Sequence, residues 1–541
     1  MKNPFISMVI VILLISASAE SMARSISKSD IIYEGTFRVP HGLHNGTNFG
    51  NNSYLNAQYQ PFAYNPNNNS IFMGSITGPA TQPKRIGEFS VPEIIHPSTV
   101  DYDIEQLPQA VVIQAPQDIS SGDFDKIRLN GNIPSDEAKA QLGGLYVYNN
   151  TLLGTVWGYY DANGAMSYRS HFSANLDWTT ATGFSGLHAV GVSPTGSFAN
   201  GGFVGGYMAE VPVKYRDQIG APMLTGRTGG PIVSRSSYGP TLWSFDPADF
   251  DFDTPAPATM LIGYPDSHQT LGGYSDVPST LYNRGAGVRA VLWPEQTDSI
   301  LFIGTIGLGI KYHPNGTPVI NSQPSCRGPG TSNAKKALSN AQLKKAEVGS
   351  YICGPTTLTY ADIYTEGKSC CFDPTSSDDG EHTTEFVLGK GTSCYGLGTK
   401  ELSETRTNAW LKQHSPTSYS CGGITMSGSE ISAGDGCCYV GKLSTDKGGT
   451  SYPSVYQVWQ YNVNDLLDVK SGSKKPWEVV PEVWNFDLPF VNPDRSKGLI
   501  GATIDQANER IFIAQSFGDG NYPLVHVFKI SNSFKSPHWQ P

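Results

Sequence analysis

Charged residues are scarce in this chain. They make up 16% of its 541 residues, and the formal net charge is −10. No stretch gathers lysine and arginine into a basic patch, so we expect neither nucleic acid nor an anionic membrane surface as a partner. After the N-terminal region, no apolar run is long enough to span a bilayer, so no membrane insertion is expected.

The common local motifs of catalysis are also missing. GFSGLH at 183–188 and GTSCYG at 391–396 both miss the spacing of G-x-S-x-G, and neither H-E-x-x-H nor GxxxxGK[ST] occurs. The usual serine hydrolases, zinc proteases and nucleotide hydrolases are therefore not indicated. An enzyme that assembles its site from distant segments would lack these motifs too, so the sequence leaves catalysis undecided.

The N-terminus has the pattern of an export signal. Lys2 precedes an apolar run, MVIVILLISA, and small residues stand at Ala17 and Ala19. This predicts a signal peptide over residues 1–23, cleaved after Ala19 or Ala23. No cysteine stands directly after the apolar run, so lipid attachment there is not expected. The mature chain is predicted to be secreted or periplasmic.

Cysteine is confined to one region, which contains two copies of one pattern. The first copy reads SCRGPGT from Ser325, YICG from Tyr351, a double cysteine at 370–371 and SSDDG from Ser376. The second reads SCYGLGT from Ser393, YSCG from Tyr419, a double cysteine at 437–438 and STDKG from Ser444. We infer a tandem duplication of about 68 residues. The repeats are predicted at 325–392 and 393–451, inside an insertion at 323–451.

Disulfides are the first interpretation of these cysteines, because an exported chain meets oxidising conditions. Adjacent cysteines rarely bond to each other, so each double cysteine is expected to reach two partners. Pairing within a repeat would join Cys326 and Cys353 to Cys370 and Cys371 in either order, and Cys394 and Cys421 to Cys437 and Cys438. A four-thiolate metal site is the alternative, although the usual C-x-x-C pairs are missing.

Outside the insertion, the sequence is typical of short strands joined by turns. Glycine (59) and proline (37) are abundant, and tyrosine (27) and phenylalanine (23) are well represented. One recurring element is a polar turn followed by an apolar strand, which predicts the middle strand of a blade. It occurs as YNPNNNSIFMGSI, YNNTLLGTVWGYY, WPEQTDSILFIGTIG and IDQANERIFIAQSFG.

A second element alternates apolar and polar residues, which predicts strands with one buried face further out in a blade. Six copies, and a seventh at GIKYHPNG, lie along the chain. They predict an all-β fold, a β-propeller of seven blades with six as the alternative. Its first part is predicted at 24–322 and its last at 452–541. The strand Tyr33–Val39 is expected to join the C-terminal blade and close the ring.

Several segments resemble a group of exported bacterial and environmental proteins with no assigned activity. They are GGYMAEVP, GAPMLTG and GPIVSRSSYGPTLWSFDP within 205–247, and YQVWQYNVNDL and PWEVVPEVWNFDLPF within 456–490. The resemblance covers much of 30–320 and 455–530 and implies a β-propeller-like fold. One CYGxGT-like segment is usual in that group, so the doubled unit is a departure from it.

Candidate site residues are few. Asp266 and His268 follow an apolar strand and are the candidate acid–base pair. His188 and Arg289 are polar residues in strand-like surroundings, where a structural role is the common one. Aromatic residues that would stack on sugars, or equally pack in a core, are Trp157, Tyr159, Tyr160 and Trp410.

No cofactor or metal is predicted, with a structural calcium ion left open. The acidic segment FDPADFDFD from Phe245 lacks the spacing and the glutamate of an EF-hand. Asp378 and Asp446, in two segments that resemble Asp-boxes, are expected to cap turns.

The composition and the duplication favour a binding function over catalysis. A duplicated loop enlarges a surface without disturbing a core. We expect a monomeric, secreted binding or surface-interaction propeller with an extracellular ligand, and carbohydrate is the ligand class considered. The alternative is a carbohydrate-active hydrolase or lyase with its site at the mouth of the propeller channel.

Overall fold

The polar turns of the recurring element form tight hairpins, and the apolar runs after them form buried strands. The computed structural model of this chain describes residues 25–49, 61–75, 84–129, 131, 140–158, 167–191, 201–228, 237–265, 267–273, 281–283, 286–312, 318–319, 350–353, 356–359, 385–390, 395–397, 405–407, 418–421, 424–428, 435–440, 451–490 and 498–531. None of the helices in these residues is long and apolar enough to cross a membrane.

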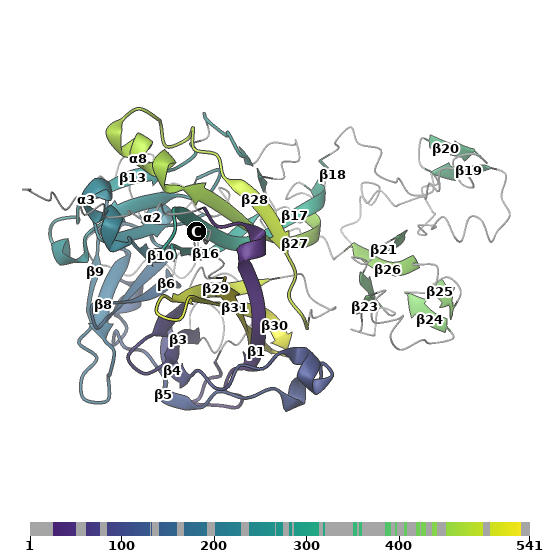
Figure 1. Cartoon of the computed structure of the whole chain (residues 1–541), viewed down its shortest axis with the longest axis horizontal. Helices are drawn as coiled ribbons and strands as arrows, with labels where there is room; N and C mark the ends of the chain where they lie inside the picture. The colour runs from purple at the N-terminus through teal and green to yellow at the C-terminus, as the bar shows by residue number, and fades with distance from the viewer. Residues whose placement is uncertain are drawn as a thin grey trace, which may run out of the picture.

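The chain folds as a five-bladed β-propeller, and each blade is an antiparallel sheet built on four strands (Figure 1). From the innermost strand outward, blade I is β2 (Phe62–Asn65), β3 (Ser70–Ser75), β4 (Arg85–Ser90) and β5 (Val112–Gln117). Blade II is β6 (Ala140–Tyr148), β7 (Thr151–Gly158), β8 (His171–Asn175) and β9 (Ser185–His188). Blade III is β10 (Tyr207–Glu210), β11 (Met223–Gly226), β12 (Leu242–Phe245) and β13 (Ala258–Ile262).

The last two blades combine distant parts of the chain. Blade IV is β16 (Gly287–Leu292), β17 (Ser299–Tyr312), β27 (Ser451–Asn462) and β28 (Glu482–Phe486). Blade V is β29 (Leu499–Asp505), β30 (Arg510–Asp519), β31 (Tyr522–Ile530) and β1 (Ile31–Arg38). The innermost strands neighbour one another in the order β29, β2, β6, β10, β16 and back to β29, which completes the ring.

Short elements connect the blades. The α-helices are α2 (Gly201–Val204), α3 (Arg216–Ile219) and α8 (Val463–Ser471). The 3-10 helices are η1 (Lys28–Asp30), η2 (Pro97–Val100), η3 (Ile104–Gln106), η4 (Asp123–Asp125), η6 (Val213–Tyr215) and η7 (Pro247–Asp249). Two further short strands, β14 (Gly272–Gly273) and β15 (Tyr282–Asn283), pair in parallel.

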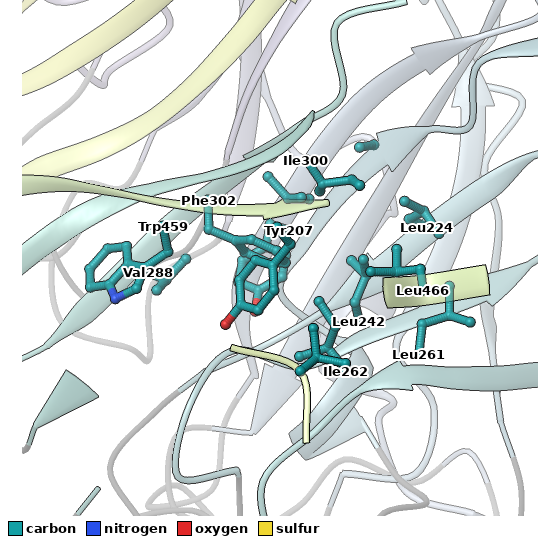
Figure 2. Close-up of a cluster of buried hydrophobic side chains, with 14 of the residues drawn as sticks. Tyr207, Leu224, Leu242, Leu261, Ile262, Val288, Ile300, Phe302, Trp459 and Leu466 are labelled. Atoms are coloured by element: carbon teal, nitrogen blue, oxygen red, sulfur yellow. The ribbon is translucent and has the colours of Figure 1, made fainter. Parts of the chain in front are cut away.

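Five separate layers of buried hydrophobic side chains lie between adjacent blades. The layer between blades III and IV contains Tyr207, Leu242, Phe302 and Trp459, all with no exposed surface (Figure 2). Phe62 and Phe512 belong to the layer between blades I and V. The other three layers join blades IV and V, I and II, and II and III. Because every blade is covered on both faces, burial of apolar area stabilises the whole ring.

The expected number of seven blades is wrong, and so is the alternative of six. The prediction takes each of the seven copies of the alternating element as one blade, but two blades contain two copies. GGYMAEVP and LWSFDPADF form β10 and β12 of blade III, and GIKYHPNG and YQVWQYNVNDL belong to β17 and β27 of blade IV. A spacing of 36 or so residues between copies can therefore span two strands of one blade as well as two blades.

The turn-and-strand element is a better guide to blade order. Its four copies form β3, β7, β17 and β30, which are all second strands and almost wholly buried where their exposure is described. The expectation that alternating strands lie further out fails for β6 and β10, which are innermost. Polar residues in alternating strands can be buried when hydrogen bonds satisfy them. The carboxylate of Glu88 in β4, for example, accepts from Asn65 at 2.9 Å and from Gln114 at 2.6 Å.

The N-terminal strand closes the ring, as the sequence predicts. β1 pairs antiparallel with β31 from Ile31↔Ile530 to Arg38↔Leu524, and Figure 1 shows it beside the yellow C-terminal strands. Thr36 Oγ1 donates to Val525 O at 2.7 Å, and Arg38 Nε donates to Asp519 Oδ2 at 2.8 Å. Blade V is therefore held by residues from both ends of the chain.

The segment between Tyr312 and Ser451 interrupts blade IV between its second and third strands. Within it, described strands pair only among themselves, apart from β18 (Pro318–Val319), which pairs with β17. Those strands are β19 (Ser350–Cys353), β20 (Thr356–Thr359), β21 (Glu385–Lys390), β22 (Tyr395–Leu397), β23 (Thr405–Thr407), β24 (Ser418–Cys421), β25 (Ile424–Ser427) and β26 (Asp435–Val440).

The hairpins β19–β20 and β24–β25 have the same length and register. The first pair is Ser350↔Thr359 in one hairpin and Ser418↔Ser427 in the other. The pair next to the turn contains a cysteine in both, Cys353↔Thr356 and Cys421↔Ile424. The equivalent positions are 68 residues apart (418 − 350). Cys437 and Cys438 lie in β26, and the other four cysteines lie outside the described residues. The duplication and the disulfide pairing stay predictions.

Ring closure can be tested with two substitutions in β1. Phe37 is fully buried in the layer between blades V and I, whereas Ile32 is 52% exposed. We expect Phe37→Ala to lower the free energy of unfolding by about 3–5 kcal/mol and Ile32→Ala by less than about 1 kcal/mol. Urea unfolding measures both. Equal small losses would contradict a closing role for β1.

Candidate functional site

Blade IV carries a two-stranded ribbon that supports the inserted segment. β17 and β27 are 14 and 12 residues long, and the innermost strand β16 pairs with β17 only as far as Thr305. Beyond that point β17 and β27 continue together through Gly307↔Ser454, Ile310↔Tyr452 and Lys311↔Ser451. The insertion therefore leaves and re-enters the ring at one place, on the side where β16 begins.

A polar seam lies between the outer strands of blade II and the loop that follows η7 in blade III. In a regular strand Ser185 and His188 would lie on opposite faces. The β8–β9 pairing shifts register between His171 and Phe172, and Gly186 has φ +157°, where a Cβ would lie 2.8 Å from the Phe172 Cβ. This local distortion brings both side chains together, with Ser185 Oγ 3.1 Å from His188 Nε2.

The other ring nitrogen of His188 determines the direction of this hydrogen bond. His188 Nδ1 lies 3.1 Å from the main-chain oxygen of Asp251. A carbonyl oxygen can only accept, so Nδ1 carries the proton. In the neutral imidazole Nε2 is then the acceptor, and the Ser185 hydroxyl donates to it. Ser185 is exposed, while His188 is buried with 6% exposure.

Asp251 and Phe250 complete the surroundings of His188. The backbone N–H groups of Thr254 and Asp253 donate to the Asp251 carboxylate and lower its pKa, and attraction to His188 adds to this shift. Phe250 stacks on the His188 ring with centroids 4.9 Å apart. An anion and an aromatic face therefore lie beside this imidazole.

Arg169 fixes the two sides of the seam relative to each other. Its Nη1 donates to Leu187 O at 3.1 Å and to Phe252 O at 2.7 Å, the residues next to His188 and Asp251. Its guanidinium lies 3.8 Å from the centroid of the Phe252 ring. Burial lowers the pKa of Arg169. Because one side chain bonds both β9 and the loop after η7, Arg169 holds His188 and the Asp251 carbonyl near each other.

A second histidine of the seam is fully buried and neutral. His171 Nε2 lies 2.9 Å from Thr225 Oγ1, whose own proton goes to Val204 O. His171 therefore donates from Nε2, and Nδ1 accepts from Ser170 Oγ at 2.8 Å. Burial lowers the pKa of His171 to about 3, with a further contribution from His188.

The structure describes only some of the sequence-predicted site residues. His268 is exposed and stacks on Trp477 at 4.7 Å, and Asp266 lies outside the described residues. Trp157 is buried, with 4% exposure, and the guanidinium carbon of Arg227 lies 4.0 Å from the centroid of the Trp157 ring. Arg289 occupies a β-bulge of β16. Further predicted residues outside the described part of the chain are Tyr159, Tyr160, Asp378, Trp410 and Asp446.

The acidic segment of blade III caps turns. Asp246 accepts from Ala248 N at 2.9 Å, and Asp251 accepts from Asp253 N and Thr254 N, each at 2.8 Å. Within the described residues no group of three or more His, Cys, Asp or Glu side chains is arranged to hold a metal ion.

Sequence reasoning singled out His188 but missed its partners. In the sequence, Ser185 belongs to GFSGLH, which misses the G-x-S-x-G spacing, and Asp251 belongs to the acidic segment FDPADFDFD. A serine three residues before the histidine gives no signal, because i and i+3 face apart in a strand. The register shift, the backbone at Gly186 and the packing of blade III on blade II bring the three residues together.

No protein-family model matches the sequence, and no match was found among curated proteins.

The buried histidines predict a specific pH dependence of stability. Burial also lowers the pKa of His526 to about 3. Between pH 6.5 and 3 the unfolded chain binds protons at both histidines and the folded chain does not, so stability is lost as the pH falls below 6.5. Each histidine contributes a slope of about 1.4 kcal/mol per pH unit.

Urea unfolding of wild-type, His171→Asn and His526→Gln proteins at pH 5 to 7 measures this dependence. We expect each variant to be less stable at pH 7 but to lose stability less steeply toward pH 5. Parallel lines for wild type and variants would show that these histidines do not titrate on unfolding.

Proposed function

We propose that this chain is a secreted binding propeller that displays its inserted segment as a recognition lobe, with carbohydrate as the ligand class. The observation that carries this proposal is the ribbon of β17 and β27, which extends beyond blade IV and holds both ends of the insertion at one point. Such a ribbon keeps the two ends of the insertion side by side, which supports a segment displayed away from the ring. A lobe displayed in this way suits recognition of a surface or polymer.

The propeller supports this division of roles. All five interblade layers are built from residues on either side of the insertion, between Ile26 and Ile306 and between Tyr456 and Ile530. Within the described part of the chain, every buried side chain of these layers therefore comes from outside the inserted segment. Export and duplication, both expected from the sequence, favour a multivalent lobe, because two equivalent units raise the effective affinity for a repetitive ligand.

Deletion of the insertion tests the proposal directly. Replacing residues 308–453 by Asn-Gly joins the paired positions Gly307 and Ser454 through a two-residue hairpin turn. We expect this ring variant to fold, with a melting temperature close to that of the full chain, and to lose binding on a glycan array. A ring variant that keeps the full glycan profile would refute the recognition lobe.

A one-unit variant provides the matched control. Deleting residues 354–421 removes one 68-residue period between equivalent cysteines and leaves four cysteines in the order of a single unit. We expect it to recognise the same glycans as the full chain, with apparent affinity for a multivalent surface about 10- to 100-fold weaker. Loss of selectivity in this variant would mean that the two units bind different ligands.

A further inference from the structure

We propose that Ser185 is a nucleophile activated by His188, and that the seam between blades II and III reacts with esters of small apolar acyl groups. A nucleophile, a base within hydrogen-bond distance and a third group that orients the base are the parts that covalent catalysis requires. Here they are Ser185 Oγ, His188 Nε2 and the Asp251 carbonyl, joined by two contacts of 3.1 Å.

The direction of the hydrogen bonds fits this role. Because Nδ1–H donates to Asp251 O, Nε2 is free of a proton and accepts from the Ser185 hydroxyl. This is the tautomer that a general base needs. Ser185 is exposed and reachable by a substrate, whereas His188 is held in place by burial, by Phe250 and by the strand pairing with His171.

The reaction is an acyl transfer. Ser185 Oγ gives its proton to His188 Nε2 and attacks the carbonyl carbon of the ester. The tetrahedral intermediate collapses, the bond to the alcohol oxygen breaks, and the alkoxide takes the proton from Nε2. Water then repeats the sequence on the acyl-serine, which releases the carboxylic acid and restores the hydroxyl.

Groups around His188 stabilise the imidazolium that forms in both steps. The Phe250 ring lies parallel to the imidazole, with an angle of 12° between planes, and presents its negative face to the charge. The Asp251 carboxylate is fixed by two backbone N–H groups and attracts the same charge. Positive charge on His188 therefore meets an anion and an aromatic face.

The surroundings indicate an apolar acyl group. Phe252 and Leu129 are 54% and 53% exposed, although large apolar side chains are usually buried. Arg169 brings them together, since it lies over the Phe252 ring and its Nη2 donates to Leu129 O at 3.2 Å. Phe252 directly follows Asp251, so this apolar surface adjoins the seam. Short aliphatic or aromatic acyl groups fit it better than charged ones.

A fluorophosphonate probe and p-nitrophenyl butyrate test the proposal on the full chain. The probe is expected to label Ser185, whose oxygen displaces fluoride from phosphorus, and peptide mass spectrometry locates the adduct. Butyrate ester hydrolysis is expected to fall at least about 100-fold in Ser185→Ala, and labelling to disappear. Because Ser185 is exposed, this variant should keep the wild-type melting temperature.

Ser173→Ala is the matched control, since Ser173 is the cross-strand partner of Ser185. It should keep both labelling and hydrolysis. His188→Gln should lose labelling while Ser185 remains present, which separates activation from the mere presence of a hydroxyl. An unlabelled wild-type protein, or equal labelling of wild type and Ser185→Ala, would overturn the proposal.

Discussion

The pairing of β1 with β31 is the constraint on which the rest of the structure depends. It joins residues almost 500 positions apart, Ile31 to Ile530, and supplies the outer strand of blade V. The entropic cost of closing a loop rises only with the logarithm of the loop length. Pairing two strands this far apart in sequence therefore costs little more free energy than pairing two closer ones. In return the ring loses two free ends, and Phe37 and Val39 complete the layer between blades V and I. Each other layer lies between blades whose positions this closure fixes.

Closure also explains where a large insertion is tolerated. β17 and β27 are hydrogen-bonded neighbours, so a segment placed between them begins and ends at adjacent points, Lys311 and Ser451. The ring geometry is unchanged whatever the length of that segment, because no blade has to move apart to admit it. An insertion between two blades would instead separate packed layers. The position of the inserted segment therefore agrees with the pairing of β17 and β27.

The sequence predicted the fold class, the second strands and the closing strand, because these depend on local patterns: a polar turn before an apolar run, and an unpaired strand at each end. It did not predict the blade number, because alternation in β10 and β12 carries no information on whether the two strands share a sheet. The sequence also identified His188 but not its partners Ser185 and Asp251, because local patterns do not show which segments meet in space. Ser185 reaches His188 through a register shift, and Asp251 is 63 positions away on another blade.

The seam between blades II and III differs from an apolar layer in what holds it together. Arg169 and His171 are buried there with carbonyl and hydroxyl partners, which satisfy them only while both blades are in place. If the blades separated, Phe252 would lose the bond from Arg169 that holds the segment next to Asp251, and His188 would lose the Asp251 carbonyl. Protonation of His171 at low pH opposes the docking of the same two blades. The reactivity proposed for Ser185 and the acid stability of this seam therefore depend on one set of contacts, and conditions that weaken the docking should abolish the reactivity before the ring itself unfolds.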